Sequence, residues 1–358
     1  MPLLPLPPIR NILLVLINNK KAISKDEEVD IRYSVLLSIG KSLKERNFNI
    51  YVSPCDKDTK ISSEILSTFQ LYQKSVTIDF LICWSPVLDK FRKHISCPYL
   101  SYENGHLKDS IIIDPNGLLE KSKYVRTLNQ LCESNYNSKK CQQYIEYYKS
   151  NNLSKREQPK SISDIPPEIN GKYVFIPTQF HLDISLKNSK LKMMDCVKKV
   201  MKLCKSNQIP LVVKIHPHLK GHHKRYQKDI IKKLRRKYYK KVYISKMSIN
   251  TLMTNALFTV TLNGSTIMDN FINQTPVLVI LKCLYSDTDA VIHDTNLKRG
   301  FQKILSKDYN LKEMLEKQRK IIWWYLQNNL SYKYSASQNI SIIEKHFESD
   351  VSFNKIER

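Results

Sequence analysis

Two segments of the sequence carry side chains that could hold a phosphate group, and the first is Lys214-Ile-His216-Pro217. It follows an apolar run, and its proline fixes a turn that leaves the lysine and the histidine at one edge. A lysine or histidine there can neutralise a phosphate or diphosphate leaving group. A loop histidine held by ordinary hydrogen bonds is the alternative interpretation.

The second segment is Asn263-Gly264-Ser265-Thr266, where an apolar run enters a tight turn and a helical pattern begins. Free N–H groups at the amino terminus of a helix, with two hydroxyls beside them, make a phosphate site. Asp269 stands where it could close a capping box over that terminus. A plain helix cap would explain Thr266 and Asp269 equally well.

A third polar segment, Gln179-Phe-His181-Leu-Asp183, offers an amide, an imidazole and a carboxylate after another apolar run. These groups are suited to recognising a nucleobase and a ribose by hydrogen bonds. An ordinary polar loop is the alternative.

Glycine is scarce, with 7 residues in 358, so those present are expected where a side chain would not fit. Gly105, Gly117 and Gly264 stand in loops after apolar runs, although ordinary turns would also explain them. Neither the P-loop motif nor the glycine-rich dinucleotide motif occurs, which disfavours P-loop kinases and dinucleotide dehydrogenases.

These polar segments need a scaffold that brings strand ends together, and the hydrophobic pattern predicts one. Short apolar runs alternate with helical patterns, which is typical of a doubly wound α/β fold. In such sheets ligands bind outside the carboxyl ends of the strands. The expected strands are 11–17, 49–52, 78–83, 99–102, 111–113, 173–176, 210–215, 241–244, 257–262 and 276–281, and the expected helices are 30–46, 62–72, one from residue 86, 187–206, 222–238, 248–255 and 266–273.

A polar, proline-containing stretch at residues 151–170 divides this pattern in two. We therefore expect two Rossmann-like α/β domains, 1–150 and 171–305, that face each other across a cleft. The remaining residues, 306–358, are expected to form helices that include Trp323-Trp324 and pack back on the first domain.

The chain carries 58 Lys and Arg against 33 Asp and Glu, a formal charge of +25, and its apolar share of 42% is typical of a folded protein. The charge indicates an anionic partner. Eight cysteines without metal-ligand spacing indicate buried free thiols in a reducing compartment. Neither a secretory signal nor an apolar run of membrane-spanning length is visible. We expect a cytoplasmic protein that meets a membrane only at its surface.

Much of the positive charge is concentrated in residues 220–241, where Ile230, Leu234 and Tyr238 recur on one helical face. A solvated helix surface is one interpretation. Attraction to anionic lipid or an acidic glycan is another, since polybasic amphipathic helices suit peripheral membrane enzymes. Nucleic-acid binding is a third, although no stacking-aromatic motif or zinc module accompanies the charge.

Taken together, these segments resemble the capsule-polysaccharide synthesis family that includes the β-Kdo transferases, which are glycosyltransferases of GT-B-like architecture. The resemblance covers roughly residues 95 to 285 and consists of five short motifs in the family's order. They are Glu103-Asn-Gly-His-Leu-Lys108, Ile113-Asp-Pro-Asn-Gly117, Pro177-Thr-Gln179, Lys214-Ile-His-Pro217, and Ser265-Thr-Ile-Met-Asp269 followed by Thr275-Pro-Val277.

The resemblance implies an inverting sugar transfer from a nucleotide-sugar donor to a glycan or glycoconjugate acceptor, without a metal or another cofactor. The first domain would hold the acceptor, with Glu103 as the base. This chain has Asn104 where the family has an aspartate, so either Glu103 takes that role or the activity is altered or lost. His106 is a second candidate base. The second domain would bind the donor through Gln179, His181, Asp183, Lys214, His216, Asn263, Gly264, Ser265, Thr266 and Asp269.

Three other functions stay open. Asp56-Lys-Asp58 and Asp287-Thr-Asp289 have the carboxylate spacing of metal-dependent GT-A transferases, although such pairs are common in solvated loops. A sugar-nucleotide epimerase would share the two-domain fold. A non-catalytic polyanion- or nucleic-acid-binding protein would bind DNA or RNA with a steep salt dependence.

Overall fold

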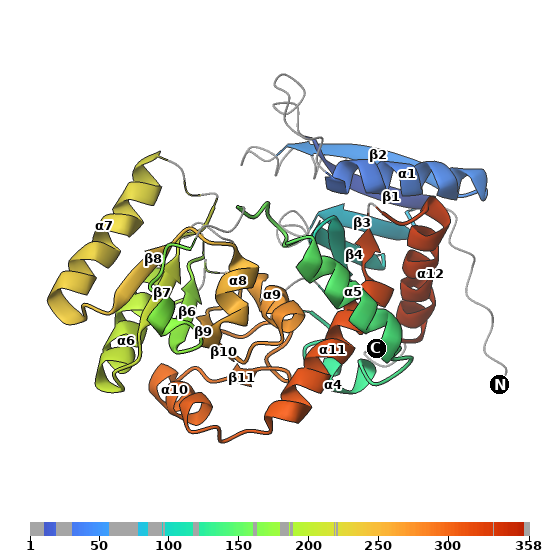
Figure 1. Ribbon diagram of the computed structural model, residues 1–358. Coiled ribbons are helices and arrows are strands. Elements are labelled where there is room, and N and C mark those ends of the chain that lie inside the picture. Colours follow the sequence, from blue (N-terminus) through green and yellow to red (C-terminus); the bar gives the residue numbers. More distant parts are fainter. Residues whose placement is uncertain are drawn as a thin grey trace. The chain divides into compact units, whose positions relative to one another are not determined.

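The computed structural model consists of two compact units, each built around one six-stranded sheet (Figure 1). The first unit comprises Met1–Gly105, Asp109–Lys123 and Gln327–Arg358, and the second comprises His106–Lys108 and Tyr124–Leu326. The structure describes residues 11–18, 31–56, 78–84, 95, 97–116, 122–159, 163–179, 186, 189–217, 219, 221–331 and 333–353. The helices expected at 62–72 and from residue 86 lie outside these ranges.

The sheet of the first unit has the strand order β12-β5-β4-β3-β1-β2. Strands β2, β1, β3 and β4 are parallel, whereas β5 runs antiparallel to β4 and to β12. The bounds are β1 Asn11–Asn18, β2 Asn49–Asp56, β3 Phe80–Trp84, β4 Tyr99–Asn104, β5 Ser110–Asp114 and β12 Leu330–Ser331.

Two helices, α1 and α12, cover one face of this sheet and share a core with it. Leu36 of α1 and Ile340 of α12 pack in the same buried cluster as Leu14 of β1. A Cβ at Gly40 would lie 2.8 Å from Cδ1 of Leu14, so glycine allows α1 to lie this close to the sheet. The bounds are α1 Ile31–Glu45 and α12 Ala336–Phe353.

The sheet of the second unit is parallel throughout, in the order β11-β10-β9-β6-β7-β8. Val174 and Ile176 of β6 lie in the core cluster with α6, α7 and α10, while Tyr173 and Phe175 lie in the cluster with α8. Burial on both faces explains why these strands read as continuous apolar runs. The bounds are β6 Tyr173–Pro177, β7 Leu211–Lys214, β8 Val242–Ser245, β9 Ala256–Thr261, β10 Val277–Val279, β11 Ile292–His293, α4 Leu128–Leu131, α5 Ser138–Ser150, η3 Pro167–Ile169, α6 Met193–Ser206, α7 Gly221–Tyr238, α8 Ile249–Thr254, α9 Thr266–Asn273, α10 Leu297–Leu305 and α11 Leu311–Asn328.

These two sheets confirm the predicted α/β class with two Rossmann-like units. The cleft expected between them stays a prediction.

The boundary between the compact units falls between Lys123 and Tyr124, and not in the stretch 151–170. The described residues of that stretch lie in the second unit, where Asn250 Nδ2 donates to the carbonyl oxygen of Leu153 at 2.8 Å. The backbone N–H of Ile249 donates to Oε1 of Gln158 at 2.9 Å. Polar residues that resembled a solvated linker therefore satisfy backbone and side-chain groups of α8.

The terminal helices divide between the units. α12 belongs to the first unit, whereas Trp323 and Trp324 of α11 belong to the second. The indole N–H of Trp323 donates to the carbonyl oxygen of Asn135 at 2.7 Å, and the ring of Trp324 meets that of Tyr124 edge-on at 5.0 Å. Both partners fall within residues 1–150, but they belong to the second unit.

Candidate functional site

The carboxyl ends of β6, β7 and β9 bring three predicted donor-binding segments together in the second unit. Nε2 of Gln179, after β6, donates to Oδ1 of Asn263, after β9, at 3.2 Å. After β7, the backbone N–H of His216 donates to Oγ1 of Thr178 at 2.9 Å. Thr178 also donates to Oε1 of Gln227 in α7 at 3.2 Å. We call this group of strand ends the carboxyl-edge site.

Gly264 is placed where the backbone approaches the Gln179 side chain. A Cβ at Gly264 would lie 3.4 Å from Cδ and from Oε1 of Gln179, which is ordinary contact distance, so a larger side chain would have to displace the buried amide. Alanine would therefore fit at this position, whereas a branched side chain would not.

The helix α9 begins directly after this turn, with Ser265 as its N-cap residue. The Ser265 side chain makes no capping hydrogen bond. The backbone N–H groups of Ile267 and Met268 donate to the carbonyl oxygens of Gly264 and Ser265, at 3.2 Å and 3.0 Å. The anion site expected at this end of α9 stays a prediction.

Asp269 does not close the expected capping box. Its buried side chain takes a hydrogen bond from Ser154 instead. Burial raises the pKa of Asp269 to about 7, although the Ser154 hydrogen bond and the charge of Lys155 both lower it. Because side chains of a helix lean toward its amino terminus, Asp269 lies over the turn that starts α9.

Lys155 is the residue of this region that sequence reasoning missed. Its charge acts both on Asp269 and on His106, so it lies within electrostatic reach of each. It belongs to the stretch interpreted as a linker, and the hydrogen bond from Ser154 to Asp269 brings this stretch to α9. No sequence pattern would have identified it.

His106 lies in the second unit, between two tyrosines. Its Nδ1 is 2.5 Å from the hydroxyl of Tyr285, and its backbone N–H donates to the hydroxyl of Tyr325 at 2.6 Å. Burial, followed by the charge of Lys155, lowers the pKa of His106 to about 3. The ring is therefore neutral at neutral pH and is a weak base there.

Glu103 lies at the end of β4 in the first unit and is partly buried. Its Oε2 accepts a hydrogen bond from the indole N–H of Trp84 at 2.7 Å, and its Oε1 accepts one from the backbone N–H of Asn104 at 2.7 Å. These hydrogen bonds fix the orientation of the carboxylate. Glu103 and His106 thus belong to different units.

The ammonium group of Lys214 is directed at the backbone rather than at the carboxyl-edge site. Nζ donates to the carbonyl oxygens of Met247 at 2.6 Å and of Lys246 at 3.4 Å. Burial lowers the pKa of Lys214, while the nearby Asp164 raises it. Lys214 thus holds the turn between β8 and α8.

His181 and Asp183 lie outside the described residues, as do Gly117 and Lys220. Within the described ranges, no group of three or more His, Cys, Asp and Glu side chains is placed to hold a metal ion. Of the two Asp-x-Asp triplets, Asp56-Lys-Asp58 has no described side chains. No described helix is long and apolar enough to span a membrane.

Residues 117–316 match the model of a protein family described as capsule polysaccharide biosynthesis proteins. The match spans most of the second unit, including the carboxyl-edge site, and does not reach Glu103 or His106. No curated protein matches the sequence significantly.

Several solved structures resemble the chain at low identity. The β-Kdo 2,7 transferase KpsC of Thermosulfurimonas dismutans is 15% identical, with a TM-score of 0.49 over 87% of this chain and 89% of its own. A glycosyltransferase from Rickettsia africae is 12% identical, with a TM-score of 0.40 over 94% and 98% of the two chains. The UDP-GlcNAc 2-epimerase of Methanocaldococcus jannaschii is 12% identical, with a TM-score of 0.38 over 94% and 99%.

Proposed function

The chain belongs to the capsule polysaccharide biosynthesis protein family, and we propose that it is a glycosyltransferase that moves a sugar from a nucleotide-sugar donor to a glycan or glycoconjugate acceptor. The observation that supports this most strongly is the meeting of Gln179, His216 and Asn263 at one carboxyl edge, where α9 begins. Ligands of parallel α/β sheets bind at that edge.

In this proposal the donor phosphate binds at the amino end of α9. Ser265 and Thr266 offer backbone N–H groups and hydroxyls there, and the helix dipole favours negative charge. His216 approaches from the end of β7. Since the ammonium of Lys214 is bound to backbone carbonyls, we assign the compensating positive charge to Lys155. The amides of Gln179 and Asn263 then recognise the base or the ribose, together with His181 and Asp183.

We assign the role of base to Glu103. Its carboxylate would take the proton of the acceptor hydroxyl as the new glycosidic bond forms, while the donor phosphate leaves with the electron pair of the broken bond. A single displacement of this kind inverts the anomeric carbon. It needs no metal ion where N–H groups and cations neutralise the leaving phosphate.

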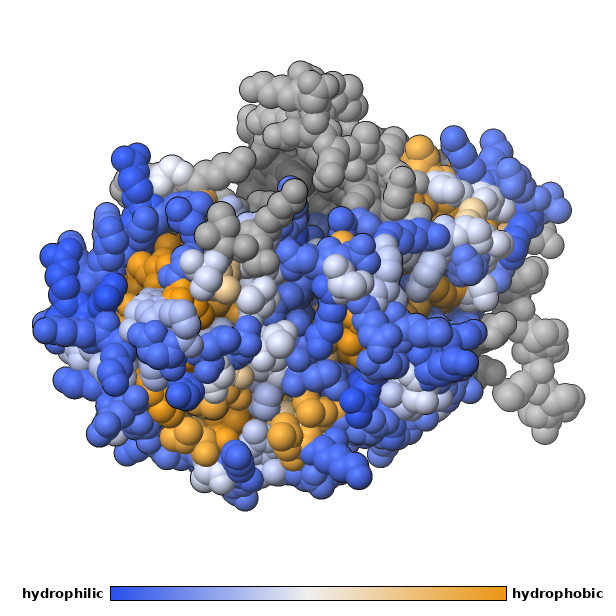
Figure 2. Space-filling model, in the orientation of Figure 1, coloured by the Kyte–Doolittle hydropathy of each residue, from blue (hydrophilic) through white to orange (hydrophobic). Residues whose placement is uncertain are grey.

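We also propose that α7 faces an anionic surface. Its exposed cations form no ion pair with any described residue, and hydrophilic residues line the outer edge where α7 lies, with apolar patches beside them (Figure 2). Each such cation near an anionic membrane contributes about 1 kcal/mol of attraction. If the protein cosediments with phosphatidylglycerol vesicles and does not bind DNA or RNA, the result would support a cytoplasmic enzyme that works at a membrane. Preferential binding of DNA or RNA would instead support the nucleic-acid interpretation.

The test of the proposed function is nucleotide release. We expect the protein to release free nucleotide from one nucleotide sugar only when a saccharide acceptor is present, and we expect Glu103→Gln to abolish release without weakening donor binding. Release without an acceptor would favour an epimerase. A product that retains the donor's anomeric configuration by NMR would overturn the assignment of Glu103 as the base of a single displacement.

A further inference from the structure

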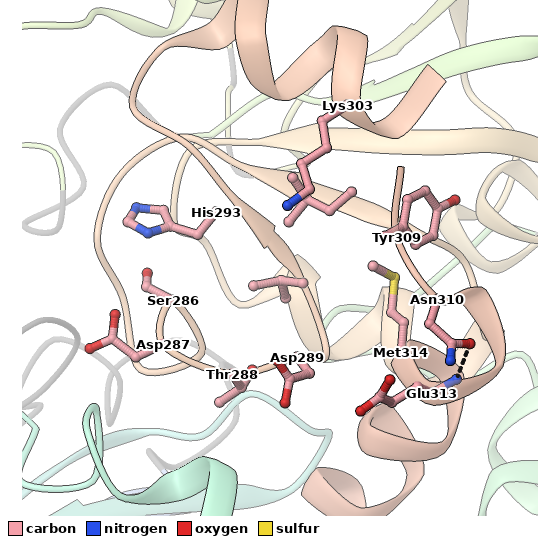
Figure 3. A pocket seen from close by; sticks show the side chains of 12 residues that line it. Ser286, Asp287, Thr288, Asp289, His293, Lys303, Tyr309, Asn310, Glu313 and Met314 are labelled. Atoms are coloured by element: carbon pink, nitrogen blue, oxygen red, sulfur yellow. Dashed lines mark hydrogen bonds between the residues drawn. The ribbon is translucent and has the colours of Figure 1, made fainter. Parts of the chain in front are cut away.

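A cavity of about 420 Å³ lies beside the edge strand β11 of the second unit (Figure 3). It shares no lining residue with the carboxyl-edge site. Its walls come from the loop Ser286–Asp289, from β11, and from the facing parts of α10 and α11. Its volume falls within the range of about 300–1,000 Å³ that small-molecule sites occupy.

The polar lining of this cavity combines two exposed charged side chains with a half-buried histidine. Nε2 of His293 is buried and has no hydrogen-bond partner among the described residues. Neither the ammonium of Lys303 nor the carboxylate of Glu313 forms a side-chain hydrogen bond or ion pair within the described ranges. The ammonium of Lys303 and the carboxylate of Glu313 are therefore open to a ligand, whereas Nε2 of His293 is closed off from solvent.

The cavity also combines acceptors, donors and apolar surface. Figure 3 shows the carboxylates of Asp287, Asp289 and Glu313 on one side and Lys303 opposite them. Val291, Ile292 and Met314 complete the lining with apolar surface. Saccharides match such a lining, because their hydroxyls donate and accept hydrogen bonds while their C–H faces pack on apolar side chains.

The charges of the lining decide against an anionic ligand. Three carboxylates and the ammonium of Lys303 line the cavity, and the ammonium of Lys282 lies beside Asp287, so the local charge is net negative. Burial lowers the pKa of His293, so this ring is neutral at neutral pH. Asp289 already accepts a hydrogen bond from Asn129 at 2.8 Å, and Asp287 lies 3.8 Å from the ammonium of Lys282. Such an arrangement repels phosphates and acidic sugars.

We propose that this cavity binds an uncharged saccharide unit, in a subsite separate from the carboxyl-edge site. The choice of a saccharide rests on the proposed function, in which a glycan is the acceptor. Lys303 donates to ring or hydroxyl oxygens, and Glu313 accepts from hydroxyls. A subsite of this kind would hold a glycan chain at a distance from its reacting end.

The test is saturation-transfer NMR on the full chain with N-acetylchitotriose, maltotriose and lactose, and with trigalacturonic acid as an acidic probe. We expect millimolar binding of at least one neutral probe. We expect Lys303→Met and Glu313→Gln to weaken that binding about tenfold. Lys298→Met and Lys312→Met, which change exposed lysines of the same helices outside the cavity, should leave it unchanged.

Nucleotide binding by the same variants separates this proposal from the proposed function. All four variants should bind nucleotide like the parent protein, and saturating nucleotide should not displace the saccharide. No binding of the neutral probes, stronger binding of the acidic probe, or equal loss in the control variants would overturn the saccharide subsite even if nucleotide binds. Failure of every nucleotide to bind would instead contradict the proposed function.

Discussion

Nε2 of Gln179 donates to Oδ1 of Asn263 at 3.2 Å, which joins two loops that are 84 residues apart in the sequence. The strands before these loops, β6 and β9, are neighbours in the sheet, so the contact closes the carboxyl edge where they end. Gly264 allows the turn after β9 to lie against the amide. This contact is the structural basis of the predictions about donor binding.

A graded series at Gly264 tests the close approach. Gly264→Ala places a Cβ at contact distance from Gln179 and should change little. Gly264→Val must displace the buried amide, so we expect a loss of about 1–3 kcal/mol of unfolding free energy and at least about tenfold weaker nucleotide binding. Thermal melts and calorimetric titrations measure both quantities, and equal behaviour of the two variants would contradict the prediction.

Asp269 should make stability depend on pH. Its pKa is about 7 in the folded chain against about 3.9 in an unfolded one, so the folded state binds the proton more tightly. The stabilisation from this proton is complete below about pH 4 and is lost as the pH rises to about 7. The melting temperature of Asp269→Asn, measured relative to the parent protein, should therefore rise across this interval and stay constant above it.

A second buried aspartate, Asp114 in the first unit, should show the same effect. Burial also raises its pKa to about 7, although Ser122 and the backbone N–H groups of Asn116 and Lys123 bond to it. Asp114→Asn should remove a similar pH dependence, and the two effects should add because the residues lie in different units. If the melting temperatures of the parent protein and of both variants changed with pH in parallel across this interval, both pKa assignments would be refuted.

The α/β architecture followed from the sequence because the relevant signals are local. Continuous apolar runs such as 173–176 and 257–262 identify strands buried on both faces, and both are present as β6 and β9. The Lys-x-His-Pro turn and the Asn-Gly-Ser-Thr turn lie at strand ends for the same reason. The sequence therefore predicts that these two turns lie at the same edge of the sheet.

What the sequence could not provide depends on long-range packing. The stretch 151–170 resembled a linker because its polar side chains bond to α8 and α9 and leave no periodic pattern. Lys214 resembled a phosphate ligand in the sequence, but its ammonium group donates to the carbonyl oxygen of Met247. Lys155 was missed because only the folded chain brings it near Asp269.

Lys155 and Lys214 should give opposite phenotypes. A nucleotide should bind more tightly than its nucleoside because of its phosphate, and Lys155→Met should reduce this difference in affinity about tenfold. The same change should raise the pKa of His106 in NMR titrations. Lys214→Met should keep nucleotide affinity and lower stability by about 1 kcal/mol, because two backbone carbonyls lose a donor. The reverse pattern would restore Lys214 as the phosphate ligand.

Tyr285 should stabilise the second unit through His106. Tyr285→Phe removes the hydroxyl that lies 2.5 Å from Nδ1 of His106, and we expect a loss of about 1 kcal/mol and a melting temperature lower by about 2–4 °C. Tyr243→Phe is the control, since its hydroxyl bonds to no described residue. Equal melting temperatures for both variants would show that the contact contributes nothing.

The most direct test of the central claim is calorimetric titration of CMP, UDP and GDP into the parent protein and into Asn263→Ala. If the donor nucleotide binds at the carboxyl-edge site, one of the three binds the parent protein, and Asn263→Ala weakens that binding at least about tenfold while the protein stays folded. Binding of none of the three, or equal affinity for both proteins, would contradict the claim.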